Sequence, residues 1–154
     1  MKKLLLLFVL LSVPSFAVTA ATLKGSYSAR LTQSYNYWQN QTATEWSEAP
    51  SVGVLVVATF NGINTLTGTA TQLYTNGMTG ASPTNTLQTA TFSGTYVVGP
   101  VGQQPGFVTI TITAGAFKGS VFTGVISASG TRLELLQVKG AGSFGVLSGT
   151  AIRQ

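Results

Sequence analysis

Hydrophobic and polar residues alternate along most of the chain after residue 20, and no stretch shows the helical period of about 3.6 residues. The clearest alternation is at 108–113, where Val108, Ile110 and Ile112 are interleaved with threonines. A period of two places successive side chains on opposite faces of an extended strand. The pattern therefore predicts an all-β chain.

Residues that favour turns divide this alternating pattern into segments. Asn61-Gly62 and Ser129-Gly130 are examples of such turn signals. We predict eight strands joined mostly by short loops, at 23–32, 51–60, 65–74, 86–98, 108–113, 116–127, 131–138 and 143–153. Eight antiparallel strands in chain order close most simply into an up-and-down (meander) barrel, and a two-sheet sandwich is the alternative.

A short motif, apolar–x–Gly–Ser/Thr–apolar, supports closure of the barrel. It occurs five times, centred on Gly25, Gly68, Gly94, Gly119 and Gly149. In a strand, the two apolar residues and the glycine share one face. We interpret the glycines mainly as positions where strands bend to close a small barrel. The alternative is that they clear space for a ligand.

The first twenty residues resemble a secretory signal peptide. Lys2 and Lys3 precede a short apolar stretch at 4–13, which is too short for a membrane-spanning helix of about 20 residues. Small residues before a cleavage point follow, and we expect cleavage after Ala20, or as second choice after Ala17. The mature chain, 21–154, is then a single exported domain, periplasmic or extracellular, with no transmembrane segment remaining.

Composition removes most enzyme chemistry. The 154 residues include no His, no Cys and no Asp, and the three acidic residues are Glu45, Glu48 and Glu134. Catalytic triads, cysteine nucleophiles, aspartic dyads and His/Cys metal sites are therefore excluded. Glu45 and Glu48 fall in a polar segment, where we interpret them as solvated charges, and Glu134 is expected to point outward beside Arg132 or Lys139. We expect no catalytic residue, no metal and no cofactor.

The charge pattern argues against nucleic-acid binding. Only 7% of the residues are charged, and removal of Lys2 and Lys3 lowers the net charge from +5 to +3. The remaining cations are scattered singly, whereas nucleic-acid binding requires a basic stripe that neutralises several phosphates together.

Six residues are candidates for binding a ligand. Trp38 and Trp46 lie in a segment rich in amides, 36–50, which is the longest connection without a strand pattern. Such aromatic residues recognise flat or apolar ligands, although capping of the barrel end is an alternative role. Tyr27, Tyr96, Gln137 and Arg153 are expected to line the lumen. If the first and last strands pair, Arg153 lies beside Tyr27.

Gly25-Ser26-Tyr27 on the first strand and an Arg near the end of the last strand resemble the calycin plan of lipocalins. In lipocalins the corresponding residues are Gly-x-Trp and an Arg that packs over the Trp, so Tyr27 and Arg153 would take these places. The last residues, Leu-Ser-Gly-Thr-Ala-Ile-Arg-Gln, are similar to those of small secreted bacterial proteins that resemble the allene-oxide-cyclase-like barrel. The resemblance implies a barrel that tends to bind ligands, and no catalytic motif carries over.

Three functions follow from these observations. The first is non-catalytic binding of a hydrophobic or amphipathic small molecule, because an eight-stranded barrel is either filled by side chains or holds one small ligand. The second is a structural protein of a surface or matrix, such as an adhesin, for which low charge would permit self-association. The third is an outer-membrane barrel, against which the polar second face of strand 23–32 argues.

Overall fold

The computed structural model of the chain describes residues 18–35, 53–76, 84–99, 106–140 and 145–154. Most of the expected signal peptide, residues 1–17, lies outside the described residues. One turn of 3-10 helix, η1 (Ala20–Thr22), precedes eight strands, which are β1 (Lys24–Tyr35), β2 (Gly53–Asn61), β3 (Thr65–Asn76), β4 (Thr84–Val98), β5 (Phe107–Gly115), β6 (Val121–Ile126), β7 (Arg132–Lys139) and β8 (Gly145–Arg153).

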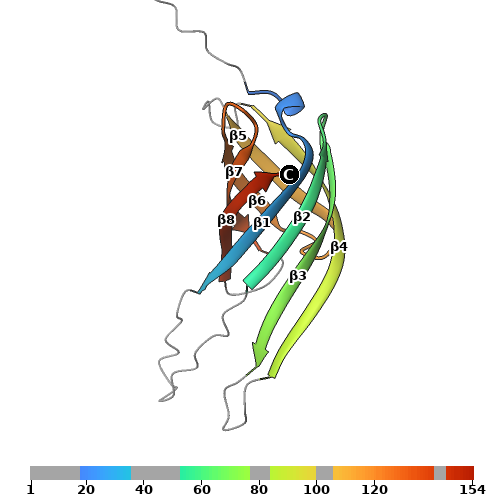
Figure 1. The fold of residues 1–154 in the computed structure, drawn as a ribbon, viewed down its shortest axis with the longest axis vertical. Coiled ribbons are helices and arrows are strands. Elements are labelled where there is room, and N and C mark those ends of the chain that lie inside the picture. Colours follow the sequence, from blue (N-terminus) through green and yellow to red (C-terminus); the bar gives the residue numbers. More distant parts are fainter. Residues whose placement is uncertain (1–17, 36–52, 77–83, 100–105, 141–144) are drawn as a thin grey trace, which may run out of the picture.

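The eight strands form one closed barrel (Figure 1). Each strand pairs antiparallel with its neighbours in the chain, and β8 pairs back onto β1 in a register that runs from Tyr27↔Arg153 to Tyr35↔Gly145. The predicted up-and-down barrel is confirmed, and the two-sheet sandwich is wrong. The described part of the chain contains no helix that is long and apolar enough to cross a membrane.

Alternation decides which side chains fill the barrel. On β2, Val54, Ala58 and Phe60 are buried, whereas Leu55 and Val57 point outward with 60% and 49% of their surface exposed. The sequence left this choice open because both faces of the segment are apolar. The structure resolves it through the register with β1, whose buried face lies beside the buried face of β2.

One predicted strand is shorter than expected. The segment 116–127 was predicted to be extended throughout, but β6 begins at Val121 and residues 116–120 form the turn after β5. Gly115 and Gly119 at the two ends of this turn have φ angles of +75° and +88°, which glycine adopts at little cost. The copy of the glycine motif centred on Gly119 is therefore in a turn, and its assignment to a strand is wrong.

Three other glycines of the motif lie on inner faces of strands, where the neighbouring strand comes very close. A Cβ atom on Gly149 would lie 2.1 Å from the carbonyl oxygen of Arg30, and one on Gly94 would lie 2.4 Å from that of Thr111. Gly68 is equally tight against the backbone of β2. The space that these glycines leave is occupied by neighbouring strands, which favours their interpretation as bending positions rather than as room for a ligand.

Substitution of Gly149 tests this interpretation. We expect Gly149→Ala to lower the free energy of unfolding by about 1–3 kcal/mol, because the added methyl group overlaps the Arg30 carbonyl and forces strands apart. Gly53→Ala is the matched control, because a Cβ atom there meets nothing within 4 Å, and we expect a change within about 0.5 kcal/mol. Urea denaturation of both variants measures the difference. Equal effects would contradict a packing role for Gly149.

The segment before β1 closes one end of the barrel. Leu23 is completely buried, and Val18 and Ala20 pack against the core. The Tyr96 hydroxyl group lies 3.0 Å from the Leu23 carbonyl oxygen and 3.3 Å from that of Ala20. Residues 18–20, which the first of the two expected cleavage points would remove, thus make contacts with the folded barrel.

These contacts predict where an exported form of the protein begins. We expect cleavage after Ala17, so that Val18 and Ala20 stay packed at the end of the barrel. The intact mass of the protein recovered from the periplasm or medium distinguishes this form from one that starts at Ala21. A mature chain that starts at Ala21 would contradict the prediction.

Candidate functional site

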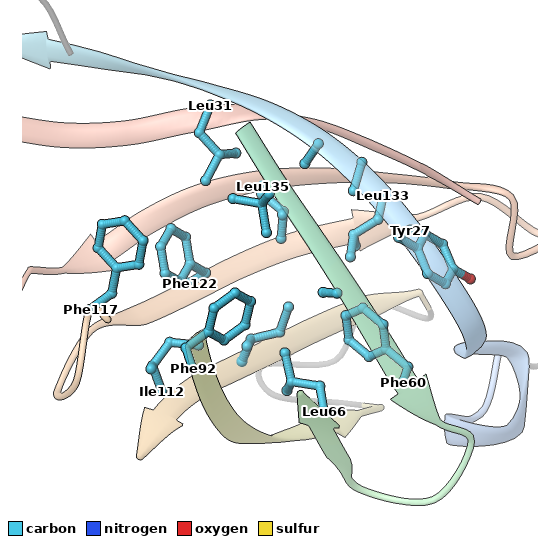
Figure 2. Close-up of a pocket in the computed structure, with 15 residues that line it drawn as sticks. Tyr27, Leu31, Phe60, Leu66, Phe92, Ile112, Phe117, Phe122, Leu133 and Leu135 are labelled. Atoms are coloured by element: carbon cyan, nitrogen blue, oxygen red, sulfur yellow. The ribbon is translucent and has the colours of Figure 1, made fainter. Parts of the chain in front are cut away.

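The barrel contains a partly open apolar cavity that all eight strands help to line (Figure 2). The volume of the cavity is about 50 Å³. A single water needs about 10–15 Å³ by this measure, and pockets for drug-sized ligands have about 300–1,000 Å³. The lumen is therefore largely filled by side chains, and the remaining space suits a short apolar group.

Three aromatic rings form the end of the barrel near η1. The ring of Phe60 contacts those of Tyr27 and Tyr96 edge-to-face, with centroid distances of 5.2 and 5.1 Å. The Tyr27 hydroxyl group donates a hydrogen bond to the Gly130 carbonyl oxygen in the turn between β6 and β7. These contacts join β1, β2, β4 and the turn between β6 and β7, and they leave the Tyr27 hydroxyl group engaged with the protein.

Both tyrosines are held in their neutral form. Burial raises the pKa of the Tyr27 phenol above its ordinary value, an effect that the nearby Arg153 guanidinium partly opposes. Burial also raises the pKa of Tyr96, against a smaller opposing effect of a hydrogen bond with the Gly62 backbone. Each side chain is only 1% exposed, which accounts for the cost of ionising it.

Phe117 lies at the other end of the cavity. Figure 2 shows its ring beside Phe122, at the opposite end of the labelled residues from Tyr27 and Phe60. Phe117 is the only described non-glycine residue with a positive φ, +61°, in the turn between β5 and β6. A bulky residue in this conformation is strained by about 1–3 kcal/mol, and such strain is found preferentially at ligand-binding sites.

The sequence interpretation missed Phe117 because it placed the residue in a strand. The signal that could have found it is the pair of glycines, Gly115 and Gly119, which surround a single aromatic residue. This spacing is typical of a turn that carries one apolar side chain back toward the core.

Gln137 is buried, but its amide group is engaged within the wall of the barrel. Its Nε2 donates to the Ser120 hydroxyl oxygen at 3.1 Å, and its Oε1 accepts from the Leu147 backbone N–H at 3.1 Å. The second bond lies just beyond Leu136↔Ser148, the last register pair of β7 with β8 at this end. The side chain thus extends the connection between these strands, and it does not line the cavity.

Arg153 pairs in register with Tyr27, as expected if the first and last strands are neighbours. Its guanidinium lies over Gly25, with Nε 3.4 Å from the place where a Cβ atom of that glycine would be. Arg153 is exposed at the barrel end, so it covers the rim rather than the lumen. Of the four predicted site residues that the structure describes, Tyr27 alone lines the cavity, and Tyr96 and Arg153 lie near it at the same end.

The predicted aromatic segment cannot be placed. Trp38 and Trp46, together with Glu45 and Glu48, lie outside the described residues. The chain leaves β1 at Tyr35 and enters β2 at Gly53. Both of these strand ends are at the end of the barrel that also carries the turn with Phe117, because β5 ends at that side.

The outer surface carries exposed apolar side chains, such as Leu136 and Ile152, together with a hydrogen-bonded ion pair. Glu134 points outward as predicted and forms an ion pair with Arg132 at 2.6 Å. Its other carboxylate oxygen accepts from the Thr150 hydroxyl group, and these two partners lower the pKa of Glu134. Among the described residues, no group of His, Cys, Asp or Glu side chains is arranged to hold a metal ion.

No family model, curated protein or solved structure matches the chain. The closed eight-stranded antiparallel barrel is consistent with the calycin plan at the level of the fold. The evidence for a site is therefore its geometry. It is an apolar cavity with hydrogen-bonded tyrosines at one end and Phe117, in a strained backbone conformation, at the opposite end.

The two tyrosines predict how stability depends on alkaline pH. In the unfolded chain their phenols ionise near pH 10, whereas the folded barrel keeps them protonated to higher pH. The unfolded state then binds fewer protons, so this contribution is intact below about pH 10 and decreases as the pH rises above it. Urea denaturation at several pH values measures the slope, which should become shallower in Tyr96→Phe. An unchanged slope would contradict the burial argument.

Proposed function

We propose that the protein is an exported, non-catalytic barrel that binds the apolar end of a small hydrophobic or amphipathic molecule in its lumen. The observation that carries this proposal is the apolar cavity inside the barrel, to which every strand contributes. An empty apolar cavity stays dry, and transfer of an apolar group from water into it is favourable.

The chemistry of the lining limits the ligand. Among the described residues that line the cavity, the only polar side chain is that of Tyr27, and its hydroxyl group is already bonded to Gly130. A carboxylate or phosphate inside the lumen would therefore lose its hydration without gaining a partner, which is strongly unfavourable. The polar part of an amphipathic ligand must stay outside the lumen, and the part inside is the end of an alkyl chain or another short apolar group.

The ligand enters, in this proposal, at the end that carries Phe117. The opposite end is closed by η1, by the three aromatic rings and by the hydrogen bonds of Tyr27 and Tyr96. Phe117 occupies a turn rather than a strand, so its side chain moves without breaking a ladder of strand hydrogen bonds. Rotation of the Phe117 side chain away from the cavity enlarges it and leaves the backbone hydrogen bonds of the turn, such as that from the Ser120 N–H to the Phe117 carbonyl oxygen, intact.

The outward faces favour this function over an outer-membrane barrel. Arg30 is exposed in the middle of β1, and the Arg132–Glu134 ion pair is exposed on β7. In a membrane barrel these outward positions would meet lipid, where charges are costly.

The Arg153 position opposite Tyr27 agrees with a calycin-type carrier, which is the more specific form of this proposal.

Titration with decanoic acid, followed by calorimetry, tests the site in the lumen. Ala58→Leu adds a larger side chain to the wall of the cavity, and we expect it to weaken binding at least about tenfold, or about 1.4 kcal/mol. Val57→Leu is the matched control, because this neighbouring residue points outward and is 49% exposed. We expect its affinity to equal that of the original protein.

Phe117→Ala provides a second readout. Because the Phe117 ring forms one end of the cavity, its removal should speed the association of decanoic acid. Equal affinities of Ala58→Leu and Val57→Leu would place the ligand outside the lumen. No binding of decanoic acid or of longer and shorter chains by the original protein would overturn the proposed function.

A further inference from the structure

Strand β4 extends well beyond its pairing with β5. It pairs with β3 from Thr84 to Thr95, but with β5 only from Phe92 to Val98. The last bond on the β5 side is the one from the Ala116 N–H to the Thr91 carbonyl oxygen. No described residue pairs with the second edge of Thr84–Ala90. Figure 1 shows β3 and β4 running on past the barrel as a two-stranded ribbon.

The ribbon is held together and exposes apolar surface. Thr71 and Thr89 share a hydrogen bond between their hydroxyl groups at 3.0 Å across the two strands. Leu87 is 69% exposed and pairs in register with Leu73, which is 38% exposed. Because register partners lie on the same face, the two leucines form one apolar spot on the outer face of the ribbon, directly beside the free edge.

This edge lacks the usual protection against strand pairing. Edge strands are commonly protected by lysine, by proline or by a bulge. Thr84–Ala90 contains no charged residue, no proline and no glycine, and the irregularity in β4 comes only at Ser93 and Gly94. The backbone groups of Asn85, Leu87 and Thr89 point to this edge, because alternate residues bond to β3 and Thr91 bonds to the β5 side. They have no partner among the described residues, and they match one kind of partner, which is another extended strand.

We propose that a second copy of this chain pairs antiparallel along Thr84–Ala90 and forms a symmetric dimer. Two-fold symmetry places this segment against itself, with Leu87 at the centre facing its counterpart. The absence of charge means that self-pairing brings no like charges together. The apolar spot of Leu73 and Leu87 meets that of the second ribbon on the same face, which buries four leucine side chains that are exposed in the single chain.

Because the chain contains no cysteine, cross-linking is a direct test of this pairing. Directly opposed residues of antiparallel strands have Cα atoms about 4.5–5.5 Å apart, which is within the range of a disulfide. We expect Leu87→Cys to form a disulfide-linked dimer under mild oxidation. Leu55→Cys is the control, because Leu55 is similarly exposed, at 60%, but lies on β2, two strands away from this edge.

Sedimentation velocity measures the dimer without a cross-link. We expect the original protein to be dimeric at micromolar concentration, Leu87→Lys to be monomeric, and Leu55→Lys to remain dimeric. All variants should keep the same circular dichroism spectrum and the same affinity for decanoic acid, which separates this proposal from the function of the lumen. A monomeric original protein, a Leu87→Lys variant that stays dimeric, or cross-linking of Leu55→Cys as fast as Leu87→Cys would each overturn the proposal. Pairing of the edge with a different protein in place of a second copy would also overturn it.

Discussion

The pairing of β8 with β1 is the constraint on which the rest of the structure depends. It runs along nearly the whole of β8 and turns a meander of eight strands into a closed barrel. A barrel of eight strands has an interior only wide enough for side chains or for one small ligand. Closure therefore decides that Tyr27, Phe60, Phe92 and their neighbours share a single core, and that the space they leave forms a cavity inside the barrel.

The described residues at the two ends of this barrel differ, because one end is closed by hydrogen-bonded tyrosines and the other carries Phe117. At the η1 end, buried tyrosine hydroxyl groups bind backbone carbonyl groups, so opening it would expose unsatisfied polar groups. At the other end, the part of the chain that the structure describes places the ring of Phe117 on the cavity, on a short turn in an unfavourable backbone conformation. On the same side, the ribbon of β3 and β4 continues past the barrel. The proposed entry into the lumen and the proposed contact with a second chain thus lie on one side of the molecule.

Much of the fold was predictable because strand periodicity and turn residues are local signals. The alternation of Val108, Ile110 and Ile112 gave β5, and the interior position of Tyr27 followed from its strand. The site was less predictable, because burial of a polar residue does not say what it binds. Gln137 was expected in the lumen, yet its amide bonds to Ser120 and Leu147 depend on where β7 and β8 cease to pair. Phe117 was missed because its role depends on a turn conformation that only the folded barrel makes visible.

The measurement that most directly tests the account is the native mass of the protein recovered from its own cells without detergent, compared with its mass after denaturation. Binding of an apolar molecule in the lumen predicts an additional mass that disappears on denaturation and that is absent from Ala58→Leu but present in Val57→Leu. Identical native and denatured masses per chain, or an additional mass that persists in Ala58→Leu, would contradict a ligand in the lumen.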